Sequence, residues 1–383
     1  MRATALLSVA ATVAVAAAAP ASAATVDDID VVATGLDNPR HVAVGRTGDV
    51  YVAEAGRGGD HARSKSCFDS AEGFACTGAT GAVTRISGHR GQQRVLKGLA
   101  SFAPIDGSSA IGPHGIDTDV FGLLVTNGGP TAPMRGDPAV PVLRDPTLVR
   151  EERVSALYGT LLRAYWPHHA RVVADLWRFE RDHNPDAEIG NPLVDSNPVD
   201  VHAEHGGAVV ADAGGNSLLR VSPGGRVRVL SLFPNVPTPS PFGTIPMNAV
   251  PTGVVRGPDG AYYMSQLTGF PFPVGGAKVF RVDPRTGAST VYAGGFTMAM
   301  DLAFGRDGTL YVLEIDSDTI LGGAREGGLW SVSRGGTPQR VALPAGTLIE
   351  PGGIDVGARG ELYVSNHSRE AGAGEVLRIT LDD

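Results

Sequence analysis

The sequence has 383 residues, a formal net charge of −8 and 42% hydrophobic residues, which is enough apolar material for a large folded core. Gly and Pro, with 52 and 27 residues, make up about a fifth of the chain and predict many turns. The negative charge argues against nucleic-acid binding, and two Cys residues exclude a cysteine-rich disulfide scaffold or zinc site.

The first 23 residues have the pattern of a signal peptide. Arg2 supplies a positive charge, residues 6–19 form an apolar run, and Ala21-Ser22-Ala23 is a small-residue cleavage site. We expect cleavage after Ala23, because the run is too short and too rich in alanine for a stable membrane span. The alternative is an uncleaved anchor. The sequence therefore predicts a secreted protein.

The two cysteines are separated by a short stretch that could close into a loop. In an oxidising compartment we expect a disulfide between Cys67 and Cys76. Two buried free thiols are the alternative.

One pattern recurs six times after the signal peptide. It consists of an apolar strand, a short turn that usually contains Gly, and a second strand that ends in an acid or an amide. The copies occupy residues 42–54, 116–127, 201–212, 254–266, 302–314 and 354–366. A third strand with a recurring apolar and Arg pattern follows at residues 81–86, 159–164, 218–221, 279–282, 327–332 and 374–379, and a fourth follows in most copies.

Six units of four antiparallel strands predict an all-β fold, a six-bladed β-propeller. The chain ends after the third strand of the sixth unit. The missing fourth strand is found at the other end, because Val32–Leu36 matches Val95–Leu99 position by position. We therefore expect residues 31–36 to pair with residues 376–380 and to close the ring, which removes an exposed strand edge. A single domain over residues 24–383 follows.

The third repeat, residues 211–221, resembles an NHL-type propeller repeat. Residues 175–198 and Asn38-Pro39-Arg40, together with the signal peptide, make the sequence similar to the secreted ScyD/ScyE family. The resemblance covers nearly the whole mature chain. It implies a secreted propeller, and it implies no catalytic residue.

The loops of the repeats fall into two sets on opposite faces of the predicted disc. Tight turns such as 45–48 and 305–308 join first to second strands on one face. The other face, the long-loop face, receives longer connections, which are typical of binding sites on rigid scaffolds. These connections are residues 55–80, 128–158, 183–197, 233–250, 267–276 and 316–326.

Polar side chains should gather where this face meets the axis, since innermost strands begin there and second strands end there. The predicted ligand-binding residues at this axial mouth are Arg40, His41, Glu54, His114, Asn127, Asp200, Asp301 and Glu314. Oxygen ligands from several blades could hold calcium, and the metal-ligand candidates are Glu54, Asn127, Asp212 and Glu314. The alternative is that these acids and amides cap their own loops by accepting bonds from backbone N–H groups.

Other motifs do not support a catalytic site. The segment from His202 to His205 lacks the four-residue spacing of helical zinc ligands, and residues 107–110 do not form a nucleophile elbow. The leading hypothesis is an exported, monomeric binding or scaffold protein for a small molecule, a glycan or a protein. The alternatives are a calcium-dependent lactonase, lyase or hydrolase, and an accessory protein in secondary-metabolite assembly.

Overall fold

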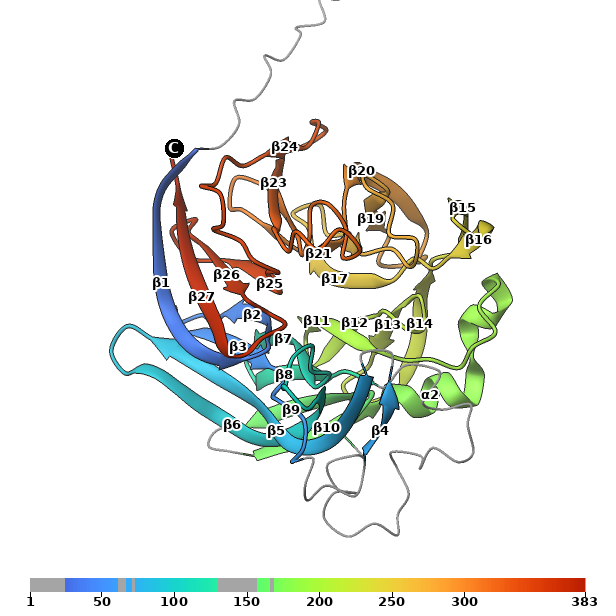
Figure 1. Ribbon diagram of the computed structural model, residues 1–383, viewed down its shortest axis with the longest axis horizontal. Helices are drawn as coiled ribbons and strands as arrows, with labels where there is room; N and C mark the ends of the chain where they lie inside the picture. The colour runs from blue at the N-terminus through green and yellow to red at the C-terminus, as the bar shows by residue number, and fades with distance from the viewer. Residues whose placement is uncertain (1–24, 61–66, 71–72, 130–156, 166–168, 383) are drawn as a thin grey trace, which may run out of the picture.

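The computed structural model describes residues 25–60, 67–70, 73–129, 157–165 and 169–382 (Figure 1). The predicted signal peptide and its cleavage site after Ala23 lie outside the described residues. Among the described residues, no helix is both long and apolar enough to cross a membrane.

The chain forms a six-bladed β-propeller of four-stranded antiparallel blades, which confirms the predicted fold (Figure 1). Listed from the axis outward, blades 1 to 3 are β2 (Pro39–Val44), β3 (Val50–Glu54), β5 (Gly73–Ser87) and β6 (Gly91–Pro104); β7 (Pro113–Asp119), β8 (Gly122–Asn127), β9 (Thr160–Tyr165) and β10 (His169–Asp175); and β11 (Pro198–Glu204), β12 (Gly207–Asp212), β13 (Ser217–Val221) and β14 (Val227–Leu232).

The remaining blades follow the same order around the ring. Blades 4 to 6 are β17 (Pro251–Arg256), β18 (Tyr262–Gln266), β19 (Ala277–Val282) and β20 (Ser289–Phe296); β21 (Ala299–Phe304), β22 (Leu310–Glu314), β23 (Gly328–Val332) and β24 (Gln339–Arg340); and β25 (Gly353–Val356), β26 (Leu362–Asn366), β27 (Ala371–Leu381) and β1 (Val26–Asp37).

The N-terminal strand closes the ring as expected. β1 lies antiparallel to β27, with Val31 opposite Leu377 and Ala33 opposite Val376. In Figure 1 the blue strand β1 runs along the red strand β27 at the outer edge of blade 6. The last blade is therefore built from both ends of the described chain, and its outer edge is covered.

The hydrophobic core lies between neighbouring blades rather than inside one of them. Val83 of blade 1 and Val125 and Leu162 of blade 2 belong to one buried cluster, and similar clusters join the other blades. Alternation along each strand sends one set of side chains into such a cluster, which explains the repeated apolar pattern. Because each blade is stabilised by its neighbours, the ring holds the innermost strands in fixed positions around the axis.

Blade 1 carries an extension that the sequence had not predicted as strand. β4 (Cys67–Ser70) pairs with the first part of β5, within residues 55–80 that we expected to be a loop. Cys67 lies opposite Cys76 in this pairing and forms the predicted disulfide, with the two Cα atoms 4.1 Å apart. The disulfide is therefore confirmed, and it joins the two strands of the extension.

Two insertions flank blade 3. A helix, α2 (Leu176–His183), and a 3₁₀ turn, η2 (Pro185–Ile189), precede it, and Asp175 caps α2 by accepting a hydrogen bond from the backbone N–H of Arg178. A hairpin of β15 (Val236–Ser240) and β16 (Gly243–Met247) follows it. Both insertions lie at the periphery of the ring, away from the axis (Figure 1).

A left-handed residue precedes four of the innermost strands. Asn38, Val250, Met298 and Glu350 have φ values of 50°, 55°, 48° and 42°. This backbone conformation is unfavourable for β-branched Val250 and uncommon for Met298 and Glu350, whereas Asn adopts it more readily, so at the first three the surrounding ring must hold it in place. In these four blades the bend lies before the innermost strand begins.

Candidate metal centre

The innermost strands follow an alternating rule at their third position. When the six innermost strands are aligned with one another, blades 1, 3 and 5 have His41, Asp200 and Asp301 at the third position. Blades 2, 4 and 6 have glycine at the same position. These glycines are Gly115, Gly253 and Gly353. Three polar side chains therefore project toward the axis from every second blade.

The glycines make room for those side chains. A Cβ atom on Gly115 would lie 2.4 Å from Cα of Asp200, and one on Gly353 would lie 2.5 Å from Cα of His41. On Gly253 it would lie 2.8 Å from Oδ1 of Asp301. Such distances are well inside van der Waals contact, so only glycine lets the neighbouring blades approach this closely.

His41, Asp200 and Asp301 converge on one point of the axis. Nε2 of His41 lies 3.6 Å from Oδ1 of Asp301 and 4.0 Å from Oδ1 of Asp200. One ligand atom from each of the three residues lies within 4.8 Å of the others, and all three residues are buried. Ligands at about 2.0–2.2 Å from one ion lie about 3.0–3.5 Å apart, so the three residues need only a small inward movement to share a cation.

Nε2 of His41 has no hydrogen-bond partner among the described residues, although the side chain is only 1% exposed. A buried imidazole nitrogen without a partner carries an appreciable energetic cost. Its other ring nitrogen lies 3.2 Å from Nδ1 of His114, which itself lies 2.8 Å from the carbonyl oxygen of Val199. The contact with His114 thus orients the His41 ring, and it leaves Nε2 facing the two carboxylates.

The two carboxylates also join neighbouring blades. Asp200 accepts a hydrogen bond from the backbone N–H of Val254 in blade 4 at 2.7 Å. Asp301 accepts one from Ile354 in blade 6 at 2.8 Å. Because each carboxylate oxygen has two lone pairs, these bonds orient the acids toward the axis and leave capacity to bind an ion.

Electrostatics at this point favour a bound cation. Burial, followed by the charge of Asp301, raises the pKa of Asp200 well above its ordinary value, and burial raises the pKa of Asp301 in the same direction. Burial and the nearby Arg40 lower the pKa of His41 to about 3, so its imidazole is neutral and can act as a ligand. A divalent ion would neutralise the two acids that burial otherwise disfavours.

A cavity of about 180 Å³ continues from the three residues along the axis. The residues that line it follow the innermost strands from His41, Asp200 and Asp301 to Asp117 and Asp355. This direction leads toward the ends of the innermost strands and hence toward the tight turns. On the opposite side, Arg40 donates a hydrogen bond to the carbonyl of Ala110 in the loop between blades 1 and 2. The cavity therefore extends away from the long-loop face.

Asp117 and Asp355 form a second acidic layer that the sequence analysis missed. Burial raises the pKa of Asp117 to about 6 and that of Asp355 to about 7. Asp117 accepts a hydrogen bond from the backbone N–H of Ala203, and Asp355 accepts one from Val44, each in the next blade. An alignment of the six innermost strands could have found both residues, since they share the fifth position.

The predicted residues at the ends of the second strands lie elsewhere and are largely occupied. Glu54 accepts a hydrogen bond from the backbone N–H of Asp37 at 2.8 Å and forms an ion pair with Arg94 at 2.6 Å. Glu314 accepts one from the backbone N–H of Thr297 at 2.6 Å. Both acids therefore cap the segment that leads into the innermost strand of their own blade.

Asp212 and Asn127 complete the set of predicted metal ligands. Asp212 accepts hydrogen bonds from the backbone N–H groups of Asn197 and Gly215 at 2.7 and 3.1 Å. Asn127 is fully buried, and its amide makes no hydrogen bond among the described residues. Within the same part of the chain, neither Glu54, Asp212 nor Glu314 belongs to a group of acids and histidines close enough to share one ion.

Comparisons with solved structures extend over the whole ring. The PQQ-bound aldose sugar dehydrogenase of Streptomyces coelicolor is similar over 95% of this chain and 100% of its own chain. The identity is 12% and the TM-score is 0.52. A gluconolactonase candidate from a structural genomics programme covers 94% of both chains with 12% identity and a TM-score of 0.51. A streptogramin B lyase matches over 93% of this chain and 98% of its own, with 13% identity and a TM-score of 0.48.

These neighbours are six-bladed β-propellers, and at this level of identity the likeness defines the class of fold alone. No protein-family model matches the sequence, and no curated protein is significantly similar to it. Function must therefore be argued from the site itself.

Proposed function

We propose that this protein is a metal-dependent propeller enzyme, a hydrolase or lyase of the general kind that includes lactonases, whose metal ion is held by His41, Asp200 and Asp301. The observation that carries the proposal is that Nε2 of His41 is buried, has no hydrogen-bond partner among the described residues and faces two buried carboxylates. A buried polar atom without a hydrogen-bond partner needs an explanation, and a bound ion is one such explanation. The alternation with glycine supports the proposal, because it leaves space on the axis beside each of the three polar side chains.

The donor set favours a transition metal over the calcium that the sequence suggested. Calcium prefers six to eight oxygen ligands, whereas one imidazole with two carboxylates suits zinc, manganese, iron or cobalt. Three protein ligands leave coordination positions open for a substrate oxygen or water, where the ion would polarise a carbonyl group.

The chain itself would supply the surroundings of the reaction. The cavity beneath the three ligands is small, so it would accept one functional group of a substrate rather than a whole large molecule. Asp355 lines this cavity, and a pKa of about 7 suits proton transfer near neutral pH.

We further propose that the protein is exported, acts as a monomer and belongs with the ScyD/ScyE-like propellers. The leader pattern before Ala24 and the disulfide of blade 1 support export. An accessory role in secondary-metabolite assembly is supported by that resemblance alone. A second function, binding of a glycan as a partner, is favoured by a polar groove on the tight-turn face.

The test of the enzyme proposal combines metal content, stability and activity. We expect the purified mature protein to contain, or to take up, about one zinc or manganese ion, and to melt at a higher temperature with metal than with EDTA. H41Q should abolish this difference in melting temperature. The variant E314Q, which changes the end of a second strand away from the three ligands, should retain it. Absence of any metal uptake would overturn the site. Uptake without turnover of a panel of lactones and esters would keep the site and overturn the enzyme assignment.

A further inference from the structure

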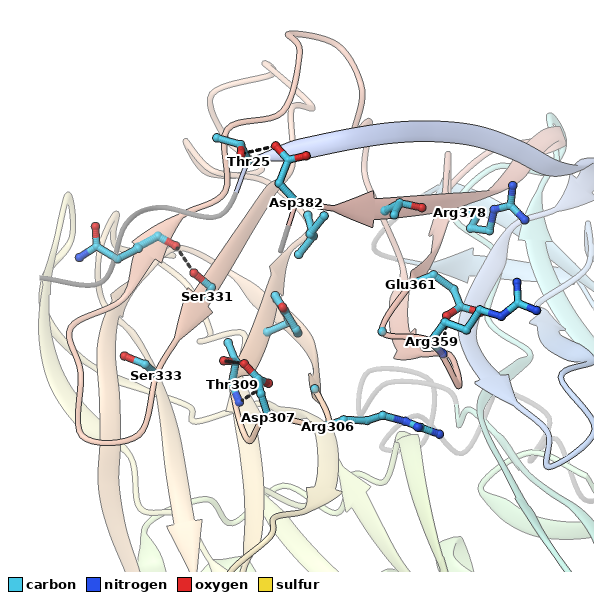
Figure 2. Close-up of a pocket in the computed structure, with 16 residues that line it drawn as sticks. Thr25, Arg306, Asp307, Thr309, Ser331, Ser333, Arg359, Glu361, Arg378 and Asp382 are labelled. Carbon is cyan, nitrogen blue, oxygen red and sulfur yellow. Dashed lines mark hydrogen bonds between the residues drawn. The ribbon is translucent and has the colours of Figure 1, made fainter.

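A second candidate site, which shares no lining residue with the axial cavity, is a groove between blades 5 and 6 on the tight-turn face (Figure 2). We call it the blade 5–6 groove. On the blade 5 side it is lined by the turn 305–308 and by the hydroxyl groups of Ser331 and Ser333, and on the blade 6 side by Arg359 and the end of β27. Its volume is about 900 Å³, which falls within the range of small-ligand sites.

The blade 5–6 groove departs from the repeat. The corresponding groove between blades 1 and 2 has a volume of about 360 Å³, and apolar Val95, Leu96 and Leu123 contribute to its lining. Among the described residues, Tyr311 and Leu381 are the large apolar side chains that line the larger groove, and most of its other side chains end in hydroxyl, guanidinium or carboxylate groups. The difference indicates a surface suited to a polar, hydroxyl-rich ligand.

The acids of the blade 5–6 groove are engaged locally. Asp307 accepts hydrogen bonds from the backbone N–H and the hydroxyl group of Thr309. Glu361 accepts one from the backbone N–H two residues earlier, and Asp382 accepts one from the hydroxyl group of Thr25. These bonds are typical of turns, and they hold the ionised carboxylates in fixed positions close to their own turns.

Two of its three arginines, by contrast, have unused guanidinium groups. Arg378 forms an ion pair with Asp30. Arg306 and Arg359 are exposed, and neither guanidinium makes a hydrogen bond or ion pair within the described residues. They occupy the tight turns of adjacent blades, and Figure 2 shows them at the same end of the groove.

We propose that the blade 5–6 groove binds an acidic oligosaccharide, with Arg306 and Arg359 on the carboxylates of its uronic acid units. A guanidinium group binds a carboxylate through two parallel N–H donors, which makes arginine suited to this task. The hydroxyl groups of Thr309, Ser331 and Ser333 can exchange hydrogen bonds with sugar hydroxyls.

Isothermal titration calorimetry with tetragalacturonic acid tests this proposal directly. We expect saturable binding by the mature protein, and at least ten-fold weaker binding by the double variant R306Q/R359Q. The variant R46Q is the matched control, because Arg46 occupies the corresponding exposed turn of blade 1. Binding should be unchanged in EDTA and in H41Q, which separates this site from the metal centre.

Comparison ligands identify which chemistry is recognised. Maltotetraose, which has no carboxylate, should bind at least ten-fold more weakly than the galacturonate. Equal binding of the two sugars would overturn the role of the arginines, and no heat with tetragalacturonic acid at millimolar concentration would overturn the site. Tighter binding of a sulfated tetrasaccharide would replace uronates by sulfate esters as the recognised group, and would overturn the proposal as stated.

Discussion

The axis of this propeller and the rim of its long-loop face, where the second strands end, carry similar polar residues. The hydrogen bonds that these residues make are different. At the rim, an acid or amide ends the second strand in all six blades, and Glu54, Asp212, Glu314 and Asn366 each accept a backbone N–H bond from a nearby segment. At the axis, the third position changes from blade to blade, and Nε2 of His41 has no hydrogen-bond partner among the described residues. In these four blades the repeated acid or amide holds the blade together, whereas the candidate site is formed by residues that depart from the repeat.

The largest loss of stability is expected when the space beside the axial glycines is filled. We expect Gly115→Ala to lower the free energy of unfolding by about 3 kcal/mol, because its Cβ would lie 2.4 Å from Cα of Asp200 and the backbone would have to move. Urea unfolding followed by circular dichroism measures the loss. Gly294→Ala is the control, since its Cβ would make an ordinary 3.6 Å contact with Lys278. Equal stabilities of the two variants would show that the alternation has no steric basis.

The pH dependence of stability tests the burial of the axial acids. In EDTA, the folded state keeps a proton on Asp355 up to a pKa of about 7, whereas the unfolded chain releases it near 3.8. Folding therefore takes up a proton at Asp355 in this range, and the contribution of Asp355 to stability should fall as the pH rises from 5 to 7, by up to about 1.4 kcal/mol per pH unit.

Removing the titrating group should remove this contribution. We expect the slope of stability against pH between 5 and 7 to be more positive in D355N than in the unaltered protein by up to about 1.4 kcal/mol per pH unit, because the other axial groups titrate in both proteins. Urea titrations at pH 5, 6 and 7 give the slopes. An unchanged slope in D355N would place the pH dependence elsewhere in the protein.

The smallest effect is expected at the rim. The variant E314Q keeps an oxygen that can accept the hydrogen bond from Thr297, so it should cost about 1 kcal/mol or less and leave metal binding intact. The same acid-to-amide change at the axis, D301N, should remove the metal-dependent rise in melting temperature. Thermal unfolding with and without metal compares them. Loss of the metal effect in E314Q but not in D301N would reverse the assignment of the two regions.

Much of the architecture could be predicted from the sequence because it repeats. Six copies of one strand pattern, and the match of Val32–Leu36 to Val95–Leu99, were enough to predict the blade count and the closure of the ring. The predicted mouth residues contained His41, Asp200 and Asp301, but they could not be separated from Glu54 or Glu314.

To separate the axial residues from the rim acids, one must know which polar atoms already have hydrogen-bond partners. Only the folded ring shows this. Whether Glu314 reaches the backbone N–H of Thr297 is decided by the left-handed bend at Met298, which no residue preference predicts for methionine. The alternation with Gly115, Gly253 and Gly353 was visible in the sequence, and it emerges only when the six innermost strands are aligned at a common position. The acids at the fifth position were missed for the same reason.

The central claim, a metal ion on the axis, is tested most directly by anomalous X-ray diffraction from crystals of the mature protein grown with manganese or zinc. We expect one strong anomalous peak between Nε2 of His41 and the carboxylates of Asp200 and Asp301, at about 2.0–2.2 Å from each ligand atom. A peak at the rim beside Glu54, Asp212 or Glu314, with the axis free of metal, would contradict it.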